Sequence, residues 1–134
     1  DAVMNTAELC NGPIWQLFEL KHAAQVLALD SSRVRWPTFK SIGLIAPHSP
    51  GSECDYEVRM LAPSSGMSED PITGSLNAAI AKWLLASGRL EKPYLVAQGT
   101  NIGRTGRVTV TPAGSDAAWI GGAVHILIEG KVHI

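Results

Sequence analysis

The chain has few cysteines, no long apolar run and no surplus of basic residues, and each shortage excludes a class of protein. Only Cys10 and Cys54 occur in 134 residues, which is too few for a disulfide framework and predicts free thiols in a reducing cytoplasm. No apolar stretch reaches the roughly 20 residues that a bilayer-spanning helix needs. The net charge is −1 and the pI about 6.5, so neither nucleic acid nor a membrane surface is expected as a partner.

Metal-site patterns and targeting signals are missing too. The four histidines, His22, His48, His125 and His133, are scattered, and no Cys/His spacing typical of a metal site occurs. We therefore expect no bound metal. The segment DAVMNTAELCNG has no basic stretch before an apolar core, so it is not expected to be a secretory signal. Its first residue is not Met, which indicates a processed or trimmed chain.

The composition that remains is typical of one globular domain over residues 1–134, with 46% hydrophobic and 17% charged residues. The strongest helix prediction covers residues 76–87, which are rich in Ala and Leu, with Ser75 as the N-cap and Gly88 after the end. This segment is apolar on most of its faces, which is typical of a buried helix.

A shorter helix is predicted over residues 21–30. Strands are predicted over residues 13–20, 41–47, 55–63, 93–99, 106–114, 117–122 and 123–134, with a tight turn at 119–122. Alternation in the third of these strands indicates that it is half-buried. The expected fold class is α+β, with a curled, largely antiparallel or mixed β-sheet wrapped around a buried central helix.

The window SEDPITGSLNAA, residues 68–79, has the residue types of a ligand site at a helix start. If Ser75 caps the helix, the amides of Gly74, Ser75 and the first turn point to solvent at the positive end of the helix dipole. Such an end binds a carboxylate, and Gly74 lets a ligand approach the backbone closely. Thr73 adds a hydroxyl, and the carboxylate of Asp70 can accept a hydrogen bond or move a proton.

The same window also has a purely structural interpretation, which spacing alone leaves open. Acidic and hydroxyl residues precede many helices, and Glu69 is explained as a favourable charge near a helix N-terminus. A second run, GTNIGRTGRV at residues 99–108, has the glycines and arginines of a phosphate cradle. Its position between two predicted strands favours a hairpin loop instead.

The sequence resembles a known family along nearly its whole length. YEVRMLAPSSGMSEDPITGSLNAAIAKWL resembles the second-domain signature of the phenazine-biosynthesis (PhzF-like) isomerases. AQGTNIGRTGRVTV and WIGGAVHILIEGKV resemble the closing strands of that family, and GPIWQLFELKHAAQVLALD resembles its entry into the second domain. The chain as a whole is therefore similar to the C-terminal domain of a two-domain PhzF-like protein.

The resemblance implies a diaminopimelate-epimerase-like fold, in which each of two domains wraps a sheet around a central helix. The site would lie between the domains, where the N-termini of the two helices face each other. The family needs no cofactor, and its founding members shift a proton and a double bond in a cyclic amino-hydroxy acid. By resemblance, Asp70 would hold or relay protons, and Gly74 and Ser75 would bind the substrate carboxylate.

Two departures separate the chain from a complete enzyme of this kind. Epimerases of the same fold use a cysteine at the start of each central helix, where this window has Pro71 and Ile72. The principal acid/base of the family is a glutamate in a Glu-x-Cys-Gly-His type motif of the first domain, and that motif does not occur here.

The expected function is therefore the carboxylate-binding half of a PhzF-like isomerase. A small carboxylic acid would be its substrate, and a first-domain chain or a homo-oligomer such as a dimer its partner. Two alternatives remain: a non-catalytic module that binds small carboxylates, and a self-associating structural domain.

Overall fold

One mixed β-sheet curls around one helix in this molecule. The computed structural model describes residues 2–35, 40–63, 65 and 67–133. Within them the strands are β1 (Val3–Cys10), β2 (Ile14–Leu20), β3 (Ser41–Pro47), β4 (Tyr56–Ala62), β5 (Met67–Asp70), β6 (Tyr94–Gln98), β7 (Gly106–Pro112) and β8 (Ala118–Gly121). The helices are α1 (Ala23–Ala28) and α2 (Gly74–Ala86), and the 3-10 turns are η1 (Ser31–Arg33) and η2 (Thr100–Ile102). The predicted α+β class with a curled sheet is confirmed.

The sheet order is β1-β2-β3-β4-β6-β7-β8, and β5 also pairs with β4. The β2–β3 and β4–β6 pairs are parallel, and the other pairs are antiparallel. The β6–β7 pair confirms that residues 99–105 form a hairpin connection, as the sequence favoured. None of the described helices is long and apolar enough to cross a bilayer.

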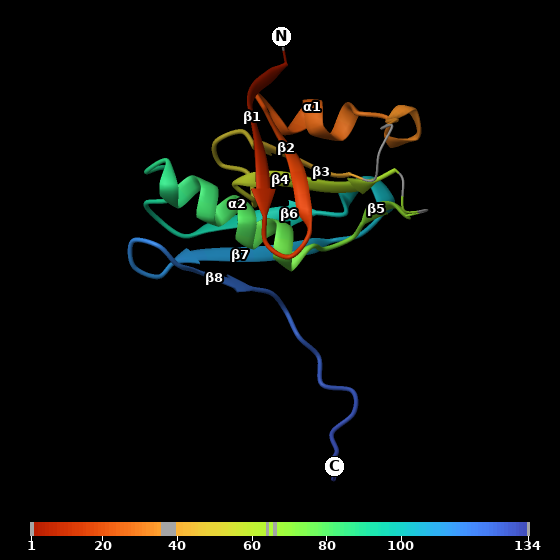
Figure 1. Cartoon of the computed structure of the whole chain (residues 1–134), viewed down its shortest axis with the longest axis vertical. Helices are drawn as coiled ribbons and strands as arrows, with labels where there is room; N and C mark the ends of the chain where they lie inside the picture. Colours follow the sequence, from red (N-terminus) through yellow and green to blue (C-terminus); the bar gives the residue numbers. More distant parts are fainter. Residues whose placement is uncertain (1, 36–39, 64, 66, 134) are drawn as a thin grey trace.

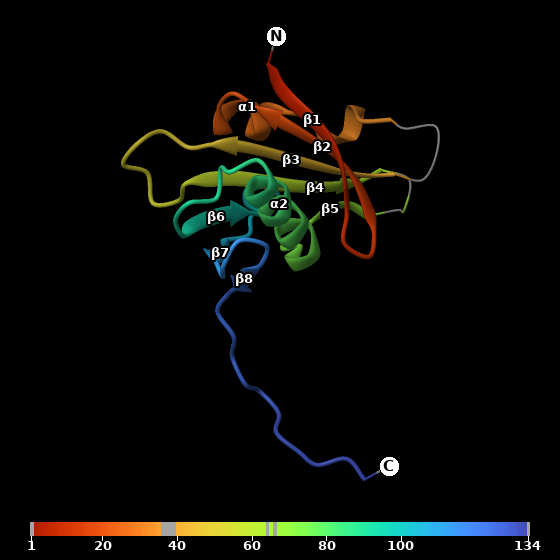
Figure 2. The ribbon, with the colours of Figure 1, turned by 60° about the vertical axis from the view of Figure 1, so that its left-hand side comes forward.

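Helix α2 lies in the concave face of the sheet, where it contacts β1, β7 and β8 (Figures 1 and 2). Leu76, Ile80 and Leu84 are almost fully buried there. Burying each of these side chains is worth about 1.5–3 kcal/mol, so packing, rather than helix propensity, holds α2 in place. The opposite edge of the helix, at Lys82 and Ala86, is exposed.

Helix α1 covers the other face of the same sheet, over β3 and β4 (Figure 2). Its Val26 packs in a second apolar cluster with residues of the strands beneath, among them Ile42, Leu44 and Leu61. Strand β4 is therefore covered on both faces, and the prediction that it is half-buried was wrong. Glu57 and Arg59, which alternation assigned to an open face, are each only 1% exposed.

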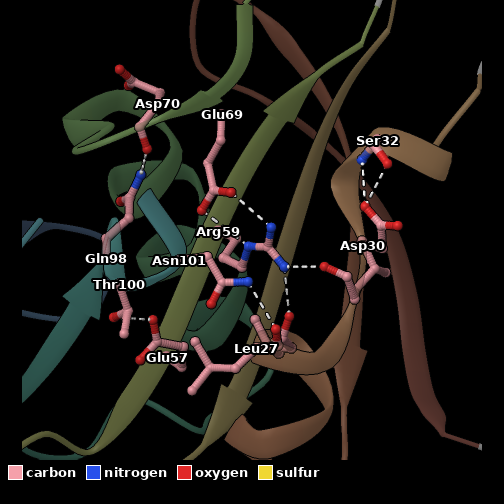
Figure 3. A network of polar contacts seen from close by, with 12 residues as sticks. Leu27, Asp30, Ser32, Glu57, Arg59, Glu69, Asp70, Gln98, Thr100 and Asn101 are labelled. Atoms are coloured by element: carbon pink, nitrogen blue, oxygen red, sulfur yellow. Dashed lines mark hydrogen bonds and ion pairs between the residues drawn. The ribbon is translucent and has the colours of Figure 1, made fainter. Parts of the chain in front are cut away.

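These buried charges each have partners (Figure 3). Arg59 Nε and Nη2 donate to the two carboxylate oxygens of Glu69 at 3.0 and 2.7 Å. Its Nη1 donates to the carbonyls of Val26 and Leu29 at 2.8 and 2.7 Å, at the C-terminal end of α1. Arg59 thus joins β4, β5 and α1. Glu69 faces this arginine and is not a decorative charge at the start of α2.

Strand β5 shares one edge of β4 with β6, and this division positions the start of α2. Met60 of β4 pairs with Asp70, the last residue of β5. Val58 of β4 pairs with Gln98, the last residue of β6. The ends of β5 and β6 therefore meet on either side of Arg59, and the chain leaves this point through Pro71 into α2.

Several sequence predictions fail at the edges of the sheet. Strands β1 and β5 were not predicted, because β1 is mixed in polarity and β5 is only four residues long. Residues 119–122 were predicted as a turn, but residues up to Gly121 belong to β8, paired with β7. The segment 123–134 was predicted as a strand. Its described part, 123–133, belongs to no strand and extends away from the sheet (Figure 1).

We predict that Glu69→Ala lowers the free energy of unfolding by about 3–5 kcal/mol, because it leaves the buried guanidinium of Arg59 without its counter-charge. Urea unfolding followed by circular dichroism measures the change. Glu53→Ala is the matched control, since it also removes a carboxylate from an arginine pair, but at an exposed position. Equal losses from the two variants would contradict this account of Arg59.

Candidate functional site

The start of α2 lies two residues earlier than the sequence predicts. Helix α2 begins at Gly74, its N-cap is Thr73, and Ser75 lies inside the first turn. The backbone of Thr73 is extended, with φ −123° and ψ 90°, and its carbonyl accepts the first helical hydrogen bond from the amide of Asn77 at 3.1 Å. The predicted N-cap role of Ser75 was therefore wrong, although Gly74 and Ser75 still carry first-turn amides.

The side chain of Thr73 does not cap the helix, because its hydroxyl is hydrogen-bonded to Asp70 and Gln98 instead. Its Oγ1 donates to Oδ2 of Asp70 at 2.6 Å and accepts from Nε2 of Gln98 at 2.9 Å. The first three amides of an α-helix have no acceptor within the helix. With Thr73 turned away from them, the amides of the first turn are left without its hydroxyl as an acceptor.

Gln98 is the fully buried residue that organises this turn. Its Oε1 accepts from the amide of Thr73 at 3.2 Å and from Nδ2 of Asn77 at 2.9 Å. Its Nε2 also donates to the carbonyl of Asp70 at 3.2 Å (Figure 3). We call Gln98, Thr73, Asn77 and Asp70 the Gln98 network. Sequence reasoning missed Gln98 and Asn77, because a lone amide in a strand and another in a helix give no spacing signal.

Two glycines let the Pro71–Ile72 segment close against the sheet. A Cβ on Gly99 would lie 2.8 Å from the carbonyl oxygen of Pro71, and φ at Gly99 is +83°, which few other residues adopt. A Cβ on Gly106 would collide with the carbonyl oxygen of Gln98 and lie 2.7 Å from Cγ1 of Ile72. In the sequence these glycines suggested a phosphate cradle. In the fold they provide close packing behind the start of α2.

The first turn of α2 opens onto a groove of about 550 Å³. Among the residues proposed from sequence for the site, only Gly74 lines it; Asp70, Thr73 and Ser75 do not. Gly74 is exposed and would have open space around a Cβ, so a ligand can reach its backbone. The wall is formed by α2, β7, β8 and the segment after β8, through Ile72, Gly74, Thr105, Arg107, Val108, Ile120, Gly121, Gly122, Ala123, Val124 and His125.

Arg107 and His125 are groove residues outside the site proposed from sequence: Arg107 belongs to the run 99–108, for which a hairpin loop was favoured, and His125 was one of the scattered histidines. Arg107 lies on β7, and its guanidinium donates to the carboxylate of Glu53 at 3.2 and 3.1 Å. This hydrogen bond raises the pKa of Arg107 and lowers the pKa of Glu53. The arginine therefore stays charged in the groove wall, where Glu53 balances its charge and Nη1 donates to the carbonyl of Gly106 at 3.0 Å.

Asp70 is half-buried, belongs to the Gln98 network and does not line this groove. Thr73 engages its Oδ2, and Figure 3 shows its carboxylate directed away from Gln98. The β1–β2 hairpin reaches the same turn, because Nδ2 of Asn11 donates to the carbonyl of Ser75 at 3.1 Å. The start of α2 is thus fixed from β5, β6 and the hairpin together.

Neither cysteine takes part in this geometry. Cys54 is buried, and burial raises the pKa of its thiol, which disfavours the reactive thiolate. Cys10 is exposed at the end of β1. The prediction that both are free thiols is confirmed. A larger groove of about 770 Å³ lies between α1 and the β3–β4 connection, and none of the residues proposed from sequence lines it.

Comparisons with known proteins agree on one family. The family model described as PhzC-PhzF, phenazine biosynthesis-like protein, matches residues 6–130. No curated protein sequence matches the chain.

Solved structures of this family share the fold. A PhzF-family protein from Bacillus anthracis has a TM-score of 0.59 at 20% identity, and the match covers 81% of this chain and 41% of that one. A PhzC/PhzF protein from Clostridium difficile has a TM-score of 0.63 at 20% identity, with 100% of this chain and 56% of that one covered. An Enterococcus faecalis PhzF-family protein has a TM-score of 0.57 at 19% identity, with 93% and 50% covered. This chain spans about half the length of these relatives.

We predict that Gly106→Ala lowers the free energy of unfolding by about 1–3 kcal/mol, because its Cβ forces Ile72 and the backbone of Gln98 apart. Gly121→Ala on the neighbouring strand is the control, since the nearest atom to its Cβ lies 4.0 Å away. Thermal unfolding of both variants checks the prediction. If Gly106→Ala were as stable as Gly121→Ala, the close packing behind α2 would not matter.

Proposed function

This chain belongs to the PhzC-PhzF family of phenazine biosynthesis-like proteins, and from that premise we propose that it supplies the carboxylate-binding half of a cofactor-independent isomerase. The observation that carries the proposal is the exposed start of α2 at Gly74, which opens onto a groove with Arg107 in its wall. Backbone amides and a guanidinium are donors that suit a carboxylate.

The substrate would be a small cyclic or amino-hydroxy carboxylic acid, and the first turn of α2 would fix its carboxylate. The open space around Gly74 supports close approach to the backbone. Ser75 would add its hydroxyl from the first turn of the helix. Thr73 would act indirectly, since its hydroxyl holds Oδ2 of Asp70.

Asp70 would handle protons next to this anchor. A proton shift breaks one C–H bond and forms another, so it needs one group that removes the proton and one that returns it. Asp70 offers a carboxylate for one of these tasks, or for a hydrogen bond from a substrate amine or hydroxyl. Because the Glu-x-Cys-Gly-His motif does not occur in these residues, the second acid/base would come from a first domain. The expected setting is the cytoplasm.

A non-catalytic carboxylate-binding module is the second candidate. It rests on the same amides and on the absence of that glutamate motif from the sequence. The two candidates differ in turnover and not in binding. A test that measures both therefore separates them.

We predict that the chain alone exchanges no substrate hydrogen with solvent, and that adding a first-domain half produces exchange. Deuterium uptake by cyclic amino-hydroxy acids in D2O, followed by mass spectrometry, is the measurement. Asp70→Asn should slow the exchange by roughly 10²–10⁴-fold, because it removes the acid/base function while preserving the shape. Exchange by the isolated chain that Asp70→Asn leaves unchanged would disprove the proposed role.

Binding is predicted to depend on the backbone at Gly74. Titration calorimetry with aminobenzoate and hydroxybenzoate as probes should show a Kd that rises about tenfold or more in Gly74→Val, a loss of roughly 1.4 kcal/mol. The added side chain has room in the fold, so stability should hold and only ligand approach should suffer. Gly130→Val, in the segment after β8, controls for a general glycine effect, since a Cβ there also meets no atom within 4 Å and the backbone is not in the left-handed region. Binding without turnover under every pairing would favour the binding module.

A further inference from the structure

The N-cap residue of α2 does not use its hydroxyl for the helix. A threonine at this position ordinarily accepts a hydrogen bond from an amide of the first turn, which is worth about 0.5–2 kcal/mol. Thr73 makes no such bond. Its Oγ1 instead donates to Oδ2 of Asp70 at 2.6 Å, a short hydrogen bond of the kind that carboxylates accept. The hydroxyl that would cap the helix therefore holds a carboxylate.

The chemistry of the two groups fixes the direction of this hydrogen bond. A carboxylate oxygen accepts and does not donate, so the single proton of the Thr73 hydroxyl is used on Asp70. The hydroxyl oxygen can then only accept from a further donor, and Nε2 of Gln98 supplies that donor at 2.9 Å. Thr73 thus receives one hydrogen bond from Gln98 and gives one to Asp70.

Backbone groups fix the orientation of the Gln98 amide in turn. Its Oε1 faces the amide N–H of Thr73 at 3.2 Å, which can only donate. Its Nε2 faces the carbonyl of Asp70 at 3.2 Å, which can only accept. Turning the amide over would bring two donors together and two acceptors together. At a fully buried residue, each group left without a partner in this way costs about 1–3 kcal/mol.

Asn77 extends the chain of hydrogen bonds to the first turn of α2. Its Nδ2 donates to Oε1 of Gln98 at 2.9 Å and to the carbonyl of Thr73 at 3.0 Å. The side-chain bonds therefore run in one direction, from Asn77 to Gln98, from Gln98 to Thr73, and from Thr73 to Asp70. Hydrogen bonds in series polarise one another, so the first two strengthen the last, which ends on the carboxylate.

The two carboxylate oxygens of Asp70 are consequently not equivalent. Oδ2 is bound by Thr73, whereas Oδ1 has no hydrogen-bond partner among the residues that the structure describes. A proton on Oδ1 leaves the bond from Thr73 intact. A proton on Oδ2 would instead meet a hydroxyl whose oxygen already accepts from Gln98. Asp70 is also half-buried, unlike Glu69, whose two oxygens are both bound by Arg59.

We propose that Thr73 and Gln98 are positioning residues that hold Oδ2 of Asp70, so that Oδ1 is the oxygen that exchanges protons in the site. This inference rests on the function proposed for Asp70. As a substrate C–H bond breaks, Oδ1 forms a bond to the proton and the electron pair stays on the substrate carbon; the return of the proton reverses both changes. The Thr73 hydroxyl keeps its own proton throughout, and both positioning residues act through Asp70.

Two substitutions at Thr73 test the positioning on the 134-residue chain alone. Thr73→Val keeps the shape of the side chain and removes the hydroxyl, whereas Thr73→Ser keeps the hydroxyl. Three-bond scalar couplings measured by NMR report the χ1 angle of Asp70. We expect one Asp70 rotamer in the unaltered chain and in Thr73→Ser, and averaging over several rotamers in Thr73→Val. A single, unchanged rotamer in Thr73→Val would overturn the proposal.

Thr100→Val is the matched control. Oγ1 of Thr100 also donates to a carboxylate, Oε1 of Glu57 at 2.7 Å, but Thr100 lies outside the Gln98 network. The variant therefore removes the same kind of hydrogen bond from the same kind of side chain. It should leave Asp70 in one rotamer. Averaging of Asp70 in Thr100→Val, to the same extent as in Thr73→Val, would contradict a specific role of Thr73.

Gln98→Met tests the preceding step of the chain. Methionine has a similar length and shape but no donor for the Thr73 hydroxyl. We expect Asp70 to average over rotamers in this variant as well, and a single rotamer would remove Gln98 from the proposal. The two Thr73 variants leave the buried amide in place, so their result does not depend on the stability of Gln98→Met.

Hydrogen exchange into the substrate, measured with a first-domain half present, separates this proposal from the proposed function. Thr73→Val should lower kcat about 10²-fold with little change in KM, the cost of misplacing a reacting group by about 1 Å. Thr73→Ser should restore most of the rate. A normal rate in Thr73→Val, together with a loss in Asp70→Asn, would overturn the positioning role alone. A normal rate in Asp70→Asn would disprove the role of Asp70 itself, and the Asp70 rotamers would still show whether Thr73 positions it.

Discussion

The hydrogen bonds of one buried amide, the side chain of Gln98, fix the point from which the site is built. The N-cap Thr73 is buried, and without an acceptor its backbone amide would cost about 1–3 kcal/mol. Gln98 accepts from the Thr73 amide and from Asn77, and it donates to the Asp70 carbonyl. The end of β6 therefore determines where α2 begins and which way Thr73 turns. That position places Gly74 in the wall of the groove.

The two faces of the sheet carry different kinds of polar interaction. On the α1 side, Arg59 and Glu69 are buried together and satisfy each other, so they contribute specificity to the fold and are closed to a ligand. At the start of α2, the exposed Gly74 lies at the groove that Arg107 also lines. Both regions lie where β5 and β6 share the edge of β4. The adjacent residues Glu69 and Asp70 of β5 therefore differ: Glu69 is buried against Arg59, whereas the carboxylate of Asp70 accepts from Thr73.

Local patterns in the sequence predicted the positions of helices and strands, because these depend mainly on neighbouring residues. The Ala/Leu-rich segment predicted α2, the 68–79 window located its start to within two residues, and apolar, β-type runs bounded by turn residues identified most of the strands. The pairing of Arg59 with Glu69 could not be predicted, because it depends on β5 folding back on β4. Gln98 is a similar case, since a strand amide acquires its role from the end of another strand. The failures thus lie where long-range pairing decides the outcome.

The segment after β8 shows the opposite kind of disagreement between sequence and structure. Its residue pattern predicts a strand, yet residues 123–133 belong to no strand. A strand is stable only when it pairs in a sheet, so this prediction depends on contacts that a local pattern does not specify. Similarly, the proposed isomerisation needs a second acid/base residue beside Asp70, and the Glu-x-Cys-Gly-His motif that would supply it does not occur in these residues.

The central claim is that the first turn of α2 binds a carboxylate through its backbone. An amide-resolved NMR titration of the ¹⁵N-labelled chain with hydroxybenzoate measures this most directly. The account predicts that the largest shifts fall on the amides of Gly74, Ser75 and Leu76, together with the Arg107 side chain. Shifts centred instead on the groove between α1 and the β3–β4 connection, or no saturable shifts at α2, would contradict it.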